Sequence, residues 1–294
     1  AAQSWAATVN FGFNEDPTLT GSFTNYGNAN WYPYDGAGYA TNTSDGFLEV
    51  TAAAGSQRSA IIFQDFDNGA VVQGFTFECD LRIGNGSGDP ADGFSISYAR
   101  AGDPALVAGD NYPTQNPATD GGIFAASPGC EDNLPEEGTK TGIAIGFDAW
   151  DSGTGTGCST IGKDIIGLSI RVDNVLVSQF ATPTKNGTCS DATSLQTGPI
   201  DTGSPYGSLC WAHLKVDLSV SGILNVYWKD KQILTNYVAA GYFPSPGRLV
   251  FAGRTGGNNQ NQHVDNIKIT TIPAAVAQVG NATSYPDGFA ITIS

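Results

Sequence analysis

Residues 251–270, FAGRTGGNNQNQHVDNIKIT, place a loop of glycine and carboxamide residues between two strand-like runs. Asn and Gln side chains both donate and accept hydrogen bonds, and glycine lets a ligand approach the backbone closely. The same residues also tolerate the tight conformations of turns. Two interpretations stay open from this stretch alone: a loop that binds a polar ligand at the end of a sheet, or a hairpin loop whose Asn residues adopt positive φ.

Carboxylates suited to catalysis are sparse. Glycoside hydrolysis needs two carboxylates facing one cleft, and the chain has six Glu residues, namely Glu15, Glu49, Glu78, Glu131, Glu136 and Glu137. Glu78 and Asp80 begin such a pattern, but position 83 is Ile. Glu136 and Glu137 are adjacent in a loop and are expected to point apart. With no Ser-His-Asp set and no phosphate loop visible, we predict that the chain is not an enzyme.

The elements that must position these residues are β-strands. In residues 75–83 the apolar side chains fall at alternate positions, which is the periodicity of a strand with one buried face. Similar runs occupy residues 92–100, 142–150, 165–172, 212–220, 223–234, 247–253 and 263–272, and a strand, turn and strand occupy residues 46–66. Strands at this spacing without helices between them predict an all-β sandwich or jelly roll. The last two runs are expected to pair with each other.

Composition limits the partners and the location. The formal charge of −15 would repel phosphates, so nucleic acid and anionic membranes are excluded as partners. No apolar run of about 18 residues predicts membrane insertion. The chain lacks Met even at position 1, which suggests a processed start, and it carries glycosylation sequons at Asn42, Asn85, Asn186 and Asn281. We therefore expect a secreted or cell-surface, extracellular glycoprotein.

The five cysteines divide into one buried thiol and four disulfide candidates. Cys79 alternates with apolar residues and is expected on the core face of its strand. The other four lie in loop-like sequence, and proximity favours pairing Cys189 with Cys210 and Cys130 with Cys158, although connectivity does not follow from sequence. A metal–thiolate site has no C-x2-C pair to support it.

Two histidines and an aromatic cluster are better explained by structural roles than by binding a ligand. His213 and His263 are too few for an imidazole metal site, and we expect His263 to make a strand-edge hydrogen bond. Four aromatic residues could form a sugar-stacking platform, but packing under the N-terminal loops is the preferred interpretation. They are Trp31, Tyr32, Tyr34 and Tyr39.

Four segments, in order, resemble the L-type lectins, the legume-lectin-like branch of the concanavalin A-like superfamily. They are ADGFSISY at 91–98, GGIFAAS at 121–127, GIAIGFDAWDS at 142–152, and LVFAGRTGG with HVDNIKIT at 249–270. The resemblance covers roughly residues 10–272 and implies a jelly-roll sandwich of antiparallel sheets. Pro273 ends the last strand-like run of this segment, and a new strand-like run begins at Phe289, so we expect a domain over residues 1–272, followed at 273–294 by a linker and a further module or assembly strand.

The resemblance also implies a carbohydrate site. The family's Ala-Asp-Gly segment, whose Asp often follows a cis peptide bond and binds sugar hydroxyls, matches Asp92. The loop that lies beside this Asp in the family matches Thr255, Gly256, Gly257 and Asn258, and the remaining carbohydrate-binding candidates are Gly122, Trp150 and Ser152.

A single calcium site is implied in the same way. Its ligands correspond to Asp148, the carbonyl of Trp150, Ser152 in place of the family's amide, and Asp164 or else Asp151. Oxygen ligands suit a hard cation such as Ca2+. Legume lectins also carry a Glu and a His for a transition metal, and this chain has Gly146 and Ile165 there, so no transition metal is expected.

The sequence thus predicts a secreted, calcium-dependent carbohydrate-binding module for adhesion or recognition of glycans and glycoproteins. The alternative is a structural subunit of an extracellular fibre, sheath or surface layer with a degenerate sugar site, because an unpaired terminal strand favours self-association or further modules.

Overall fold

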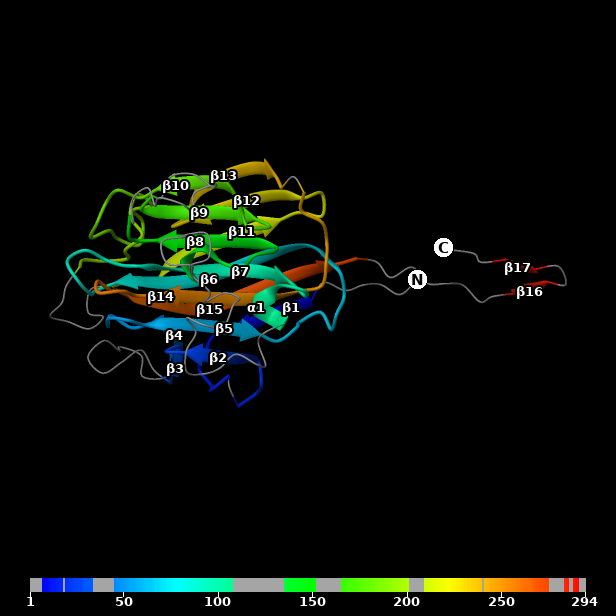
Figure 1. The fold of residues 1–294 in the computed structure, drawn as a ribbon, viewed down its shortest axis with the longest axis horizontal. Helices are drawn as coiled ribbons and strands as arrows, with labels where there is room; N and C mark the ends of the chain where they lie inside the picture. The colour runs from blue at the N-terminus through cyan, green and yellow to red at the C-terminus, as the bar shows by residue number, and fades with distance from the viewer. Residues whose placement is uncertain are drawn as a thin grey trace.

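The computed structural model describes residues 7–17, 19–33, 45–107, 135–151, 165–200, 209–239, 241–274, 283–285 and 288–290. Within these residues, two large antiparallel sheets lie face to face (Figure 1). The all-β sandwich that the alternating sequence predicts is confirmed.

The first sheet has eight strands. They are β1 (Ala7–Phe11), β3 (Asn30–Tyr32), β4 (Phe47–Thr51), β6 (Val72–Gly84), β11 (Ala212–Leu218), β12 (Ile223–Trp228), β13 (Lys231–Val238) and β15 (Asn261–Pro273). Their spatial order is β13-β12-β11-β6-β15-β4-β3, and β1 extends the sheet by pairing with β15.

The second sheet has seven strands and carries the candidate site. They are β2 (Phe23–Gly27), β5 (Arg58–Phe63), β7 (Gly93–Arg100), β8 (Ile143–Asp148), β9 (Gly167–Val172), β10 (Val175–Ala181) and β14 (Gly247–Arg254), in the order β10-β9-β8-β7-β14-β5-β2. A short helix α1 (Pro104–Val107) follows β7, and a 3-10 helix η4 (Pro135–Glu137) lies on β7, β8 and β14.

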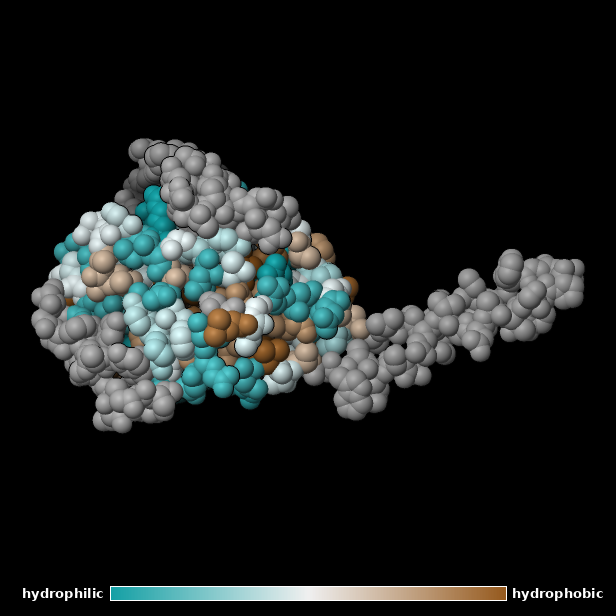
Figure 2. Space-filling model, turned by 90° about the horizontal axis from the view of Figure 1, so that it is seen from below, coloured by the Kyte–Doolittle hydropathy of each residue, from teal (hydrophilic) through white to brown (hydrophobic). Residues whose placement is uncertain are grey.

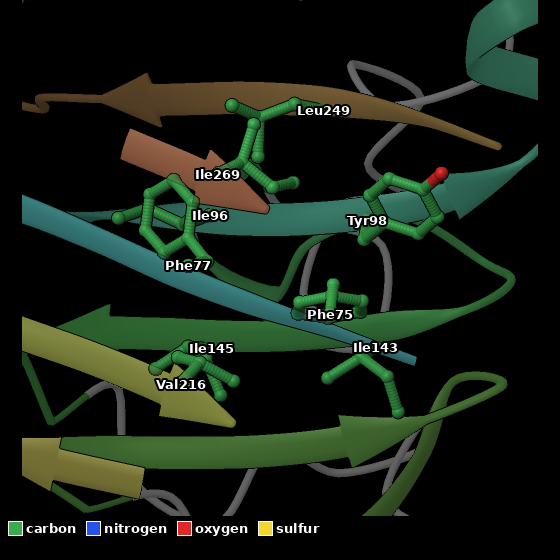
Figure 3. A pocket seen from close by; sticks show the side chains of 9 residues that line it. All are labelled: Phe75, Phe77, Ile96, Tyr98, Ile143, Ile145, Val216, Leu249 and Ile269. Carbon is green, nitrogen blue, oxygen red and sulfur yellow. The ribbon is translucent and has the colours of Figure 1, made fainter. Parts of the chain in front are cut away.

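The core lies between the sheets and follows from the alternation. In β11 the residues alternate between buried and half-buried from Ala212 to Leu218, so only one face of the strand meets the opposite sheet. A small gap remains within this core, and Figure 3 shows that aromatic and aliphatic side chains from both sheets surround it. Its lining is apolar, so it belongs to the packed interior and offers no site for a polar ligand.

The sequence-based assignment of strand partners needs two corrections. The runs 247–253 and 263–272 do not pair: β14 pairs with β5 and β7, whereas β15 pairs with β4 and β6 in the other sheet. The single run 223–234 divides into β12 and β13, because Lys229 and Asp230 both have positive φ and form a tight turn between them.

The disulfide between Cys189 and Cys210 is present, with 6.0 Å between the Cα atoms, and confirms the predicted pairing. Cys79 is a free, fully buried thiol on the core face, as predicted. Cys130 and Cys158 lie outside the described residues. The remaining strands, β16 (Thr283–Tyr285) and β17 (Gly288–Ala290), pair with each other and with neither large sheet.

Hydrophilic residues cover much of the face shown in Figure 2, and hydrophobic residues occupy smaller areas. Among the residues that the structure describes, no helix is long and apolar enough to cross a membrane.

Candidate functional site

Three loops and the end of a strand meet at one end of the sandwich. The loop between β6 and β7 contacts the loop between β14 and β15, because Ser87 donates its amide to the carbonyl of Asn259 over 3.0 Å. Both loops lie at the same end in Figure 1. The turn between β4 and β5 joins them through the Ser56 amide, which donates to the Gly256 carbonyl over 2.9 Å. The end of β8, at Asp148, completes the group.

Asp92 lies at the centre of this group, immediately before β7. The peptide bond between Ala91 and Asp92 is cis, as the resemblance implies. The Asp92 amide donates to the Arg254 carbonyl over 3.3 Å, and the Asp92 carbonyl accepts a 2.7 Å bond from the Ala149 amide. These contacts tie Asp92 to β14 on one side and to the end of β8 on the other.

The carboxylate of Asp92 is buried and incompletely bonded. Asp92 is 7% exposed, and its Oδ2 has no hydrogen-bond partner among the described residues. Burial raises the pKa of this carboxyl, and the nearby guanidinium groups of Arg254 and Arg58 oppose the rise. Buried polar atoms nearly always have partners, so an open acceptor here indicates a place for a ligand's donor.

Gly256 lies close to that carboxylate. A Cβ atom at position 256 would lie 3.2 Å from Asp92 Oδ2 and 3.5 Å from Oδ1. Any side chain there would therefore press on the carboxylate. Gly257 is exposed and a Cβ there would meet nothing within 4 Å, and Asn258 is half-buried beside it.

Thr255 holds the loop rather than facing a ligand. Its amide donates to the Gln57 carbonyl over 3.0 Å, and its hydroxyl donates to the Ala54 carbonyl over 2.6 Å. The Gln57 amide donates back to the Thr255 hydroxyl over 3.0 Å. Because these groups are engaged within the protein, the expectation that Thr255 offers its backbone N–H to a sugar is replaced by a positioning role.

The hairpin interpretation of GGNNQNQ, residues 256–262, is wrong. The loop connects two different sheets, and none of these residues, all of which the structure describes, has positive φ. The Asn residues are therefore not explained by a tolerance of left-handed backbone. This leaves the backbone of Gly256, next to Asp92, and the half-buried Asn258 and Asn259 that follow it in the loop as the candidate surface.

The end of β8 and the residues directly after it carry three described calcium candidates, namely Asp148, Trp150 and the exposed Asp151, the alternative to Asp164. Asp148 is 7% exposed, and its Oδ1 accepts a 3.0 Å bond from the Trp150 amide. Trp150 is 37% exposed. Gly122, Ser152 and Asp164 lie outside the described residues. Across the part of the chain that the structure describes, no group of three or more His, Cys, Asp or Glu side chains is placed to hold a metal ion.

An ion pair that the sequence analysis missed lies beneath Asp92. Arg254, the last residue of β14, donates from Nε to both carboxylate oxygens of Glu136, over 2.7 and 2.9 Å, and the same nitrogen is 3.7 Å from Asp92 Oδ2. Burial raises the pKa of Glu136 to about 7, although Arg254 opposes the rise. The one available signal was a cation in an otherwise small, uncharged stretch, FAGRTGG.

The adjacent Glu137 forms an ion pair with a different arginine, the buried Arg171 of β9. Glu136 and Glu137 therefore point apart, as predicted, toward strands on opposite sides of β7 and β8. Neither carboxylate faces an open cleft together with the other, so the two do not form the acid and base pair of a glycosidase.

Other predicted residues fall into structural roles. His263 is buried in a central strand, not at an edge: it accepts a 3.1 Å bond from Arg82 Nε, and its Nε2 lies 3.3 Å from Glu49 Oε2. Trp31 and Tyr32 pack as preferred, the first by donating to the Phe13 carbonyl and the second by stacking on a neighbouring ring. Tyr34 and Tyr39 lie outside the described residues.

Two of the four sequons lie on described residues. Asn85 is 6% exposed, whereas Asn186 is exposed to solvent. Asn42 and Asn281 lie outside the described residues.

Comparison with known proteins finds similarity at the level of structure only. No family model matches the sequence, and no curated protein matches it. Among solved structures, the Ca2+-bound exoplasmic/lumenal domain of VIP36 superposes with a TM-score of 0.52 at 11% identity, covering 92% of this chain and 92% of that chain. The same domain has also been solved bound to Ca2+ and Man3GlcNAc.

Plant lectins superpose equally well. Lectin II from Ulex europaeus has a TM-score of 0.52 at 15% identity and covers 90% of this chain and 97% of its own. The lectin from Bauhinia forficata, in complex with GalNAc, has a TM-score of 0.51 at 16% identity and covers 92% of this chain and 99% of its own. Together with the two-sheet topology, these similarities show that the chain has the fold of the L-type lectins.

Proposed function

We propose that the chain is a carbohydrate-binding module that recognises glycans through Asp92 and the loop of Gly256, Gly257 and Asn258. The observation that carries the proposal is the buried Asp92 Oδ2, which has no hydrogen-bond partner among the described residues and lies next to Gly256. A carboxylate accepts hydrogen bonds from two neighbouring hydroxyl groups, and the Asn258 amide supplies both donors and acceptors. Vicinal hydroxyl groups of a sugar fit this arrangement.

Sugar binding at this site has a direct test. Glycans bearing mannose, galactose and N-acetylgalactosamine, the sugars of the lectin complexes above, should be screened as an immobilised panel. Asp92→Ala should remove binding to any glycan that the native chain retains, while the melting temperature in excess calcium changes little. Asp89→Asn, on the same loop and exposed, is the matched control and should bind normally. Binding retained in Asp92→Ala would refute the site.

We further propose that calcium binds at Asp148 and the carbonyl of Trp150, with Ser152 and Asp164 as the remaining ligands. The donor set is oxygen-only, which fits a hard cation. When bound, the ion would add positive charge beside Asp92 and hold the residues that follow β8. The dependence of sugar binding on calcium follows from that ordering.

Calcium binding is tested by thermal unfolding. A ligand that binds only the native state raises its apparent stability, so the melting temperature should be higher in calcium than in chelator. Asp148→Ala should abolish the difference. An equal calcium-dependent rise in Asp148→Ala would place the ion elsewhere.

The C-terminal strands favour self-association as a second function. Because β16 and β17 pair with neither large sheet, we place the boundary of the lectin-like sandwich at residue 272 and assign residues 273–294 to a linker and a further module or assembly strand. Deleting residues 274–294 should abolish self-association, measured by sedimentation, without changing glycan binding. Self-association that survives the deletion would refute this assignment.

Secretion and use of the exposed Asn186 sequon belong to the same proposal and are tested by the mass of the native protein.

A further inference from the structure

The positive charge at the site is built into the chain. Arg254 Nε lies between Glu136, at 2.7 and 2.9 Å, and Asp92 Oδ2, at 3.7 Å. The Glu136 side chain is 3% exposed and that of Arg254 is 22% exposed, so solvent screens the group only weakly. Burial lowers the pKa of Arg254, but Glu136, Asp92 and Asp148 together raise it by more, so the guanidinium stays charged.

The surrounding sequence makes room for this ion pair. A Cβ at Gly146 would lie 2.5 Å from the Glu136 carbonyl oxygen, and one at Gly93 would lie 3.0 Å from the Glu136 Cβ. Ser95 donates its hydroxyl to the Pro135 carbonyl over 2.5 Å and fixes the start of η4. Position 146 is where legume lectins carry the Glu of their transition-metal site; here the backbone of Glu136 fills the space that a side chain would need.

Glu136 in turn fixes the guanidinium. Both of its oxygens accept from the same nitrogen, so Arg254 cannot swing toward solvent without leaving a buried carboxylate unpaired. Arg58, opposite Arg254 in the strand pair, adds a second positive charge that acts on Asp92. A chelator would remove calcium bound at the end of β8, but the positive charges of Arg254 and Arg58 would remain.

We propose that Arg254, held by Glu136, is a positioning residue that keeps Asp92 charged and oriented, so that glycan binding survives in part when calcium is removed. This inference rests on the proposed function, because it concerns the same carboxylate. It predicts two contributions to affinity: one from calcium at the end of β8, and one from Arg254 that chelator does not affect.

The test compares two neighbouring ion pairs in the full chain. Arg254→Gln with Glu136→Gln neutralises the pair beneath Asp92, and Arg171→Gln with Glu137→Gln neutralises the adjacent pair on η4, which points toward β9. Both double variants neutralise both members of an ion pair on η4 with the same two substitutions, so they lose the same side-chain volume, and only the first removes the cation next to Asp92. Arg254→Lys keeps the charge and serves as the conservative rescue.

The readout is the affinity for the panel glycan that the native chain binds and Asp92→Ala does not, measured in calcium and in excess chelator. The native chain should retain measurable binding in chelator. The Arg254/Glu136 variant should lose about tenfold of it, as expected for one charge-assisted contact. Arg254→Lys and the Arg171/Glu137 variant should stay within about threefold of the native chain, and melting curves establish that each variant is folded.

Two results would overturn the inference without touching the proposed function. One is native binding that chelator abolishes completely; the other is equal binding in chelator by the native chain and the Arg254/Glu136 variant. If the native chain binds no panel glycan even with calcium, the proposed function fails and the inference fails with it.

Discussion

The two ends of the β7–β14 strand pair carry the same residue types and use them differently. Arg254 lies opposite Gly93 at one end, and Arg100 lies opposite Gly247 at the other. Arg100 donates from Nε and Nη2 to the two carboxylate oxygens of Asp173, over 2.9 and 2.8 Å. Its guanidinium also lies 3.7 Å from the centre of the Phe243 ring.

At the Arg100 end, which we call the closed end, the carboxylates have hydrogen-bond partners within the protein. Asp173 Oδ1 also accepts the Gly142 amide over 2.8 Å, and nearby Asp103 Oδ2 accepts both the amide and the hydroxyl of Thr141. At the Arg254 end, which we call the open end, Asp92 Oδ2 has no hydrogen-bond partner in the described residues. A saturated group of polar side chains stabilises the fold, whereas a buried carboxylate oxygen without a hydrogen-bond partner leaves a hydrogen bond for a ligand.

Breaking the closed end should cost stability and leave binding intact. Arg100→Met leaves Asp173 without its bidentate donor, and the free energy of unfolding should fall by about 3 kcal/mol, the upper end of what loss of hydrogen bonds between charged groups costs, because Asp173 is partly exposed. Urea denaturation measures this. Lys185→Met, which removes an exposed ion pair with Asp89, is the control and should change stability by less than about 1 kcal/mol.

The comparison would fail if Arg100→Met weakened glycan binding as strongly as Asp92→Ala does. That result would mean that the two ends are coupled and that the closed end also serves the site.

His263 offers a second, smaller test, because it is a buried and partnered group near the open end. Burial lowers its pKa from 6.5 to about 4; the bond to Glu49 opposes the shift, and the charge of Arg82 adds to it. The folded state therefore binds the proton less readily than the unfolded state. The stability due to neutral His263 is complete above pH 6.5 and is lost as the pH falls toward 4, by up to about 3 kcal/mol.

Urea denaturation of the native chain and of His263→Gln across this pH range isolates the effect. The difference in unfolding free energy between the two should change with pH, because the variant has no imidazole to protonate. His213→Gln removes a half-exposed histidine from the outer face of the same sheet and controls for the loss of an imidazole that is not buried. A His263→Gln variant that retains the full pH dependence would contradict the prediction.

Strand positions and the central carboxylate could be predicted from sequence because both have local signals. Alternation of apolar residues marked β6, β7, β8, β9 and β11, since a strand with one buried face repeats every two residues. The motif that identified Asp92, ADGFSISY at 91–98, is likewise one continuous stretch of sequence, so it can be recognised without knowing the fold. The short strands β1, β2 and β3 were missed, because a stretch of three to five residues rich in aromatics and turns gives too few periods to recognise.

Long-range relations could not be predicted. Alternation shows that β14 and β15 are strands but carries no information on which sheet each joins, so the expected pairing was wrong. Glu136 and Arg254 are 118 residues apart, and no periodicity relates a 3-10 turn to the end of a distant strand. The opposite end was hidden for the same reason: Arg100 and Asp173 are 73 residues apart.

The smallest predicted effect separates adjacent glycines in the open end. Gly256→Ala would place a methyl group 3.2 Å from Asp92 Oδ2, tight enough to restrict a ligand's approach, whereas Gly257→Ala would meet nothing within 4 Å. Neither residue has positive φ, so neither substitution strains the backbone, and both should melt like the native chain. Gly256→Ala should weaken glycan binding by about fivefold, which corresponds to about 1 kcal/mol. Gly257→Ala should leave it unchanged, because a methyl group there does not reach the carboxylate. Equal affinities for the two variants, measured by titration calorimetry, would show that the ligand does not pass over Gly256 to reach Asp92, and the open acceptor would then need another explanation.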